Sequence, residues 1–264
     1  MLHVSAETDF MIGIWIFVIG ACMGSFLNCM SWRIVHGESV LRGRSHCDVC
    51  GHVLMPLDLI PIVSYLLHRG RCRWCRAKLS SRHVWAELVT GLVYVLLVFR
   101  YDISLQALEY LLFASVLLAA AFADLEGYII PDRFIAAGIV WRIPFLFLTG
   151  DWMKEGADAL LGGFAVGGGL LAIVLIYEKI RGIEAMGGGD LKLLFVTGLY
   201  LGWAKNLLCL LLACIIGILF AFATGRGKKE GKKELFPWGP SICMAAILAV
   251  LIGDRLIGAY LGLF

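Results

Sequence analysis

Long segments without charge are the most regular feature of this chain. No Asp, Glu, Lys or Arg occurs in four apolar stretches of 23, 19, 20 and 19 residues, at positions 10–32, 159–177, 206–225 and 235–253. Roughly 20 consecutive apolar residues are enough for an α-helix to cross a lipid bilayer. The pattern therefore predicts helices that span a membrane.

Shorter apolar stretches bring the expected number of spans to about eight. We predict them near residues 11–32, 84–99, 106–123, 133–149, 158–177, 188–203, 206–223 and 240–262. Arg142 interrupts the fourth of these. The composition agrees, because 60% of the residues are hydrophobic and 16% are charged. In ordinary globular domains about 45–50% of the residues are hydrophobic and about 25% are charged. We expect an all-α polytopic membrane protein.

The distribution of basic residues predicts the orientation. Loop 33–83 has nine Lys and Arg residues and segment 224–239 has five, whereas the first ten residues have none. Because basic residues favour the cytoplasmic side, we expect 33–83 to be cytoplasmic and the N-terminus to lie outside. A secretory signal peptide would begin with a basic region, so we interpret 1–32 as a retained helix. The net charge of +3 does not indicate a nucleic acid partner; the expected partner is the lipid bilayer.

Four of the nine cysteines form two Cys-x-x-Cys units, Cys47 with Cys50 and Cys72 with Cys75. Two such units can close a tetrahedral four-thiolate zinc site, which leaves no open position for water. The alternatives are two disulfides or unrelated buried thiols, and a reducing cytosol disfavours disulfides. We predict a structural zinc ion. The expected domains are a transmembrane helix (1–32), a cytoplasmic zinc-binding domain (33–83) and a seven-helix transmembrane domain (84–264).

Two acidic residues lie at predicted membrane boundaries. Asp124 follows an uncharged stretch, and Asp190 follows Gly187, Gly188 and Gly189. Acidic residues at membrane depth are costly and usually mark a functional site. Two carboxyl groups brought together can share a proton, which suits acid–base hydrolysis of a peptide bond. Glycines without a Cβ atom would let a substrate backbone approach. The alternative is two unrelated, hydrated helix ends, and the spacing alone does not pair them.

Several motifs together resemble the type 4 prepilin peptidases, which are bifunctional leader peptidase/N-methyltransferases. They are GSFLNC (24–29), RGRCRWC (69–75), AELVTG (86–91), D-x-x-x-x-x-I-P-D (124–132), MGGGDLK (186–192) and FPWGP (236–240). The resemblance covers nearly the whole chain. It implies an intramembrane aspartyl protease of the Gly-x-Gly-Asp class in the cytoplasmic membrane of a bacterium.

The resemblance also implies roles for residues. Asp124 and Asp190 occupy the positions of the catalytic pair, and the three glycines before Asp190 those of an active-site loop. The expected substrates are prepilin or pseudopilin precursors, each with a short basic leader, a glycine before the cut and a hydrophobic helix after it. A second activity would methylate the new N-terminus with S-adenosylmethionine. Glu87, in AELVTG, is a candidate for binding the leader or the product amine; the alternative is an ordinary helix-start acid. Lys192 is expected to be an anchor.

Two other functions remain open from the residues. One is an ion- or proton-coupled transporter in which Asp124 and Asp190 bind the ion and the zinc loop is a regulatory module. A transporter would have buried charges along a path through the membrane, whereas the acids here cluster at one face. The other is a zinc-containing membrane scaffold without chemistry, which would leave the motifs around the two aspartates unexplained.

Overall fold

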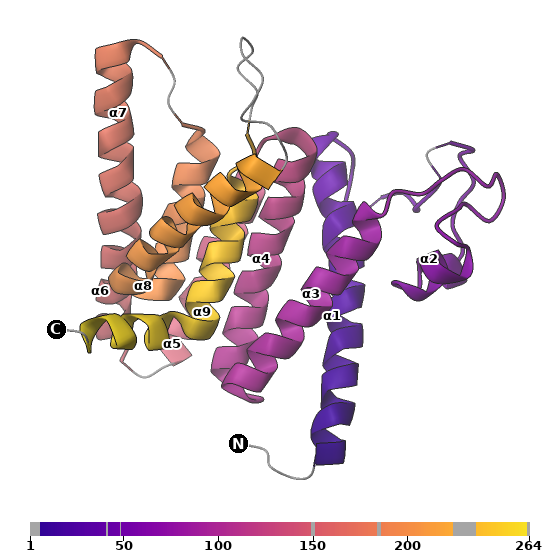
Figure 1. Cartoon of the computed structure of the whole chain (residues 1–264), viewed down its shortest axis with the longest axis horizontal. Coiled ribbons are helices and arrows are strands. Elements are labelled where there is room, and N and C mark those ends of the chain that lie inside the picture. Colours follow the sequence, from indigo (N-terminus) through magenta and orange to yellow (C-terminus); the bar gives the residue numbers. More distant parts are fainter. Residues whose placement is uncertain are drawn as a thin grey trace. The chain divides into compact units, whose positions relative to one another are not determined.

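The computed structural model describes residues 6–40, 42–47, 49–148, 151–183, 186–223 and 236–262. Figure 1 shows helices joined by loops, and the described residues contain no β-strand, only two isolated β-bridges. The predicted all-α fold is confirmed. The basic run at 225–234 lies outside the described residues. The chain divides into two compact units, 1–107 and 108–264, and the predicted domain boundaries at 32 and 83 stay a prediction.

Two long helices form the first unit, α1 (Ala6–Val35) and α3 (Arg82–Tyr101), which pack against each other. Glycines make this contact close: a Cβ atom at Gly24 would lie 2.6 Å from the Ala86 carbonyl oxygen, and one at Gly20 would lie 2.8 Å from Gly91 Cα. Small residues commonly let membrane helices approach in this way. Between the two helices the chain carries the four cysteines, a short 3-10 helix η1 (Pro56–Leu59) and α2 (Val63–Leu67).

Six helical elements and a π-helical segment form the second unit. They are α4 (Leu105–Gly127, which begins in the first unit), α5 (Asp132–Leu148), α6 (Trp152–Gly162), η2 (Gly163–Gly168), α7 (Gly169–Arg181), α8 (Gly188–Ala223) and α9 (Gly239–Leu261). Helix α4 is buried along most of its length, with Leu117 and Ala120 fully enclosed. The core of this unit therefore forms around α4.

Helix α8 reverses direction at Gly202, whose φ of 69° and ψ of 178° are not helical. Figure 1 shows two helical segments meeting at this turn. Asn206 bridges them, because its Nδ2 donates to the Leu194 carbonyl at 3.1 Å and its Oδ1 accepts from Thr197 Oγ1 at 2.8 Å. A straight helix would separate residues 197 and 206 by about 13 Å along its axis. The predicted spans 188–203 and 206–223 are the two arms of this hairpin.

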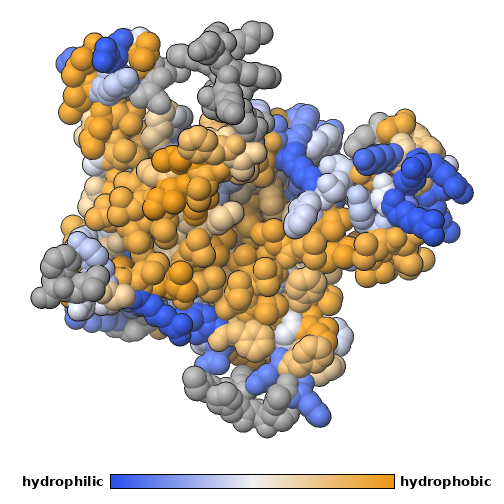
Figure 2. Space-filling model, in the orientation of Figure 1, coloured by the Kyte–Doolittle hydropathy of each residue, from blue (hydrophilic) through white to orange (hydrophobic). Residues whose placement is uncertain are grey.

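Six helical segments are long and apolar enough to cross a membrane: Glu7–Val35, Arg82–Tyr101, Leu105–Gly127, Trp152–Arg181, Gly188–Ala223 and Gly239–Leu261. This count differs from the expected eight for two reasons. The two arms of α8 count as one segment, and α5 has only 17 residues, with Arg142 and Pro144 inside it. On the face shown in Figure 2, hydrophobic residues cover the helices broadly and hydrophilic residues gather toward the helix ends. The chain is a multi-pass membrane protein.

Candidate active site and metal centre

Asp124 lies in the last turn of α4 and its side chain is buried, with 5% of its surface exposed. Its Oδ2 accepts a hydrogen bond of 2.9 Å from the backbone N–H of Gly239, at the start of α9. The N-terminus of a helix presents free N–H groups and a positive dipole end to an anion. Helix α9 thus fixes the orientation of the Asp124 carboxylate.

Asp190 lies in the first turn of α8, next to the three glycines. A Cβ atom at Gly189 would lie 3.1 Å from the Cβ of Ile130, so this glycine allows the turn after α4 to pack closely. A Cβ atom at Gly187 would lie 3.4 Å from Asp190 Oδ2, and one at Gly188 would meet nothing within 4 Å. Only Gly189 is therefore required by packing within this loop.

The structure brings the two aspartates together within the second unit. The charge of Asp124 acts directly on the Asp190 carboxyl, and both carboxyls act on the buried thiol of Cys243 in α9. The contact between Gly189 and Ile130 joins the two segments on the loop side. Asp124, which is buried, and Asp190, which is half-buried, thus form one acidic pair although they lie 66 positions apart in the sequence.

The four predicted metal ligands also come together. The sulfur atoms of Cys47, Cys50, Cys72 and Cys75 all lie within 4.8 Å of one another. The same backbone turn forms around each pair: Cys47 N–H donates to the His52 carbonyl at 2.9 Å, and Cys72 N–H donates to the Ala77 carbonyl at 2.9 Å. Two equivalent turns that aim four thiols at one point fit a tetrahedral metal ion.

The backbone around the second turn favours the thiolate form of Cys72, whereas at Cys75 the hydrogen bond from the Ala77 backbone is outweighed by desolvation and by the neighbouring thiols, which raise its pKa to about 11. Hydrogen bonds from the backbone N–H groups of Cys75 and Trp74 lower the pKa of the Cys72 thiol to about 7, although desolvation opposes this. Metal ligation requires the deprotonated form of cysteine. The donor set, its spacing and this pKa agree with a site that could hold a metal ion.

Glu87 is buried in α3, with 6% of its surface exposed. Its Oε2 accepts a hydrogen bond of 2.7 Å from the backbone N–H of Ile62, the residue before α2. Ile62 has a φ of 61°, a conformation that β-branched residues rarely adopt. Glu87 therefore fastens the cysteine-containing segment to α3, and its predicted role in leader or amine binding stays a prediction.

Three features of the second unit were not assigned from the sequence. Gly239 lies in the FPWGP motif, but it contacts Asp124 through its backbone N–H. Every residue except proline has this group, so the sequence does not single it out. Cys243 of α9 is buried, and its thiol lies within electrostatic range of both aspartates. Arg142 was noted only as an interruption; its Nη1 donates to Glu109 of α4, and both side chains are about nine-tenths buried.

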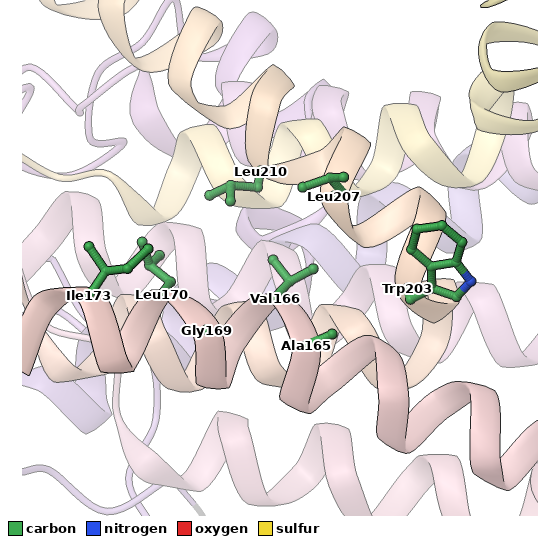
Figure 3. A pocket seen from close by; sticks show the side chains of 8 residues that line it. All are labelled: Ala165, Val166, Gly169, Leu170, Ile173, Trp203, Leu207 and Leu210. Atoms are coloured by element: carbon green, nitrogen blue, oxygen red, sulfur yellow. The ribbon is translucent and has the colours of Figure 1, made fainter. Parts of the chain in front are cut away.

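An apolar groove of about 310 Å³ lies between the η2–α7 segment and the second arm of α8. Figure 3 shows Val166, Gly169 and Ile173 on one side, with Leu207 and Leu210 on the other. None of the predicted catalytic or metal-binding residues lines it. The groove is therefore not part of the candidate active site.

Comparisons with known proteins found two matching families and several similar proteins. Residues 18–101 match the family described as Bacterial Peptidase A24 N-terminal domain, and residues 111–222 match the Type IV leader peptidase family. A prepilin leader peptidase/N-methyltransferase of Myxococcus xanthus is 36% identical over 86% of this chain and 69% of its own length. One of Bacillus subtilis is 32% identical over 93% of this chain and 96% of its own length. No solved structure matches.

Proposed function

The chain belongs to the type IV leader peptidase family, and we propose that it removes the leader peptide from prepilin or pseudopilin precursors by a two-aspartate mechanism. The observation that carries this proposal is the pair formed by the buried Asp124 and the half-buried Asp190, which α4 and α8 bring within electrostatic range of each other beside the start of α9. Such a pair is the chemical requirement for acid–base hydrolysis of a peptide bond.

In the proposed reaction the two carboxyls share one proton. The ionised carboxylate takes a proton from a water molecule, and the water oxygen attacks the scissile carbonyl carbon. The protonated carboxyl donates to the carbonyl oxygen, which would otherwise accumulate negative charge. When the tetrahedral intermediate breaks down, the proton taken from water passes to the departing nitrogen, and the proton on the former carbonyl oxygen returns to the carboxylate that donated it. The products are a leader with a new carboxylate and a mature chain with a new N-terminal amine.

Three glycines around the aspartate pair are proposed to assist it in different ways. The Gly239 N–H holds one carboxylate in orientation at 2.9 Å. Gly187 and Gly188 have room around their Cα atoms and would let an extended substrate backbone lie beside Asp190. We place the pair at the cytoplasmic face, with the N-terminus outside and residues 33–83 in the cytoplasm, because basic residues concentrate in the loops on that side.

The cysteine cluster is proposed to hold one structural zinc ion. Cys47, Cys50, Cys72 and Cys75 would bind it as thiolates, and the ion would join two turns that are 21 residues apart in the sequence. Bound zinc would supply folding energy to this segment and no open coordination position for catalysis.

A second activity is proposed from the relatives. The proteins of Myxococcus xanthus and Bacillus subtilis are both called N-methyltransferases as well as leader peptidases. The proposed reaction transfers the methyl group of S-adenosylmethionine to the amine that cleavage releases. Cleavage and methylation are separate proposals, because the aspartate pair supports only the first.

Purified protein incubated with a prepilin in detergent or liposomes tests the proposal. Mass analysis of the new N-terminus reports cleavage, and a second sample with S-adenosylmethionine reports a mass increase by one methyl group. Asp124→Asn and Asp190→Asn should each abolish cleavage, whereas Asp151→Asn, a change in an exposed acid at the start of α6, should not. Near-full cleavage by either of the first two variants would overturn the two-aspartate mechanism.

A further inference from the structure

We propose that α5 is a brace that sets the spacing of the two aspartates, with Asp132 and Arg142 as its positioning residues. The proposal rests on the proposed function of Asp124 and Asp190, and it assigns a role to the one predicted span that is not among the six candidate membrane segments. Its evidence is a set of contacts that join α5 to both aspartate-bearing helices at three levels.

The first level lies next to the aspartates. Asp132, at the start of α5, accepts a hydrogen bond of 2.6 Å from Lys192 Nζ. Lys192 comes two residues after Asp190, and Asp132 comes eight residues after Asp124. The pair therefore joins the two segments that carry the catalytic carboxyls. Because Asp132 is 77% exposed and Lys192 53%, water and salt can reach this contact.

The second level is at the middle of α5, where Gly138 allows its backbone to meet both neighbours. A Cβ atom there would lie 2.7 Å from Val196 Cγ1 in α8 and 3.5 Å from Val116 Cγ1 in α4. Tyr200 of α8 donates a hydrogen bond of 2.7 Å to the Gly138 carbonyl. Because Gly138 has no side chain, the backbone of α5 can lie close to side chains of both α4 and α8 at this point.

The third level is the buried Arg142. Its Nη1 donates to Glu109 near the start of α4, and its Nε donates to the Leu199 carbonyl of α8 at 2.9 Å. Leu199 lies three residues before the break at Gly202, so the first arm of α8 ends here and its last carbonyls need other partners. A cation at the C-terminal end of a helix is also favourable. One guanidinium thus ties α4 to the first arm of α8.

These contacts constrain the two helices whose other ends carry Asp124 and Asp190. A carboxyl pair that shares a proton works only within a narrow range of separations, and a displacement of about 1 Å can cost about 100-fold in rate. A helix that contacts α8 near the pair, and both α4 and α8 at its middle and at its far end, can hold that separation. This gives a role to Arg142, the one charged residue of α5 after its first two positions.

Steady-state cleavage of a prepilin by charge variants tests the brace. Lys192→Met should lower kcat by about 3- to 10-fold and leave KM within about 2-fold, because the variant displaces the pair without touching substrate. The exchange Asp132→Lys with Lys192→Asp should restore kcat. Lys205→Met is the matched control: Lys205 pairs with Asp254 at 2.8 Å, a contact between α8 and α9 that includes no residue of α5, and the kcat of this variant should not change. An unchanged kcat in Lys192→Met, or an exchange variant no better than the single ones, would overturn the brace.

Hydrogen exchange provides a readout that does not depend on activity. Arg142→Lys, which keeps the charge but loses the forked geometry, should accelerate exchange at 119–127 and 188–194, whereas Lys205→Met should not. Unchanged protection at both segments would overturn the brace even if the enzyme cleaves normally. If wild-type protein cleaves no precursor, the proposed function fails, and the exchange data alone decide whether α5 positions the two carboxyls.

Discussion

Replacing Gly239 by alanine should disable the site while leaving the fold intact. A Cβ atom at this position would lie 2.8 Å from Asp124 Oδ2 and 3.2 Å from its Cβ and Cγ. Asp124 is buried, so its carboxylate has little room to move away. Either the carboxylate or the start of α9 must shift by several tenths of an ångström, which lengthens the 2.9 Å hydrogen bond from the Gly239 N–H.

The size of the effect follows from this geometry. A misplaced catalytic group or one lost preorganised donor each costs about 10²-fold in rate, so kcat for Gly239→Ala should fall by about 10²-fold with KM little changed. Gly258→Ala is the control: it lies in the same helix, and a Cβ atom there would meet nothing within 4 Å. Alanine favours a helix by up to about 1 kcal/mol over glycine, so this control should be active and at least as stable. Equal kcat values for the two variants, in a cleavage assay with matched protein concentrations, would refute the reasoning about Asp124.

Three further outcomes follow from contacts of single residues. Gly188→Ala should leave stability unchanged and raise KM in the same cleavage assay, because its methyl group would meet no neighbour in the free protein but would lie in the proposed substrate path, whereas Gly189→Ala should lower stability because its methyl group would lie 3.1 Å from Ile130 Cβ; an unchanged KM in Gly188→Ala would contradict the proposed substrate path. Metal analysis should find one zinc per chain, absent after Cys47→Ser with Cys72→Ser, and a retained stoichiometry would contradict the four-thiolate site. Glu87→Gln keeps an oxygen acceptor for the Ile62 N–H, so the resistance of residues 55–70 to proteolysis should not change. Glu87→Ala removes the acceptor and should lower that resistance. If Glu87→Gln lowers the resistance and Glu87→Ala does not, the carboxylate charge has a role that the 2.7 Å hydrogen bond does not explain.

The apolar pattern predicted most of the helices because a bilayer imposes it. Uncharged stretches such as 10–32 and 235–253 correspond to α1 and α9, since a spanning helix needs a long apolar run and little else. The same pattern split α8 correctly into two arms, because Lys205 interrupts it close to Gly202. It gave no indication that α5 would contact α4 and α8 through Arg142, because a charge partner 33 residues away depends on tertiary packing.

The candidate site was predictable as far as its side chains are distinctive. Scarcity of charge singled out Asp124 and Asp190, and the Cys-x-x-Cys spacing singled out the four thiols. Gly239 was not predictable as part of the site, because its contribution is a backbone N–H that any residue but proline has. What distinguishes it is the lack of a side chain beside Asp124, and this becomes visible only when α9 and α4 are placed together.

Cleavage of a prepilin by the paired variants Asp124→Asn and Asp190→Asn tests the central claim most directly. Both proteins should insert into membranes, bind zinc as the wild type does and yield no mature N-terminus by mass analysis, because neither single carboxyl can hold and donate the shared proton. A mature N-terminus produced at near wild-type rate by either variant would contradict the account.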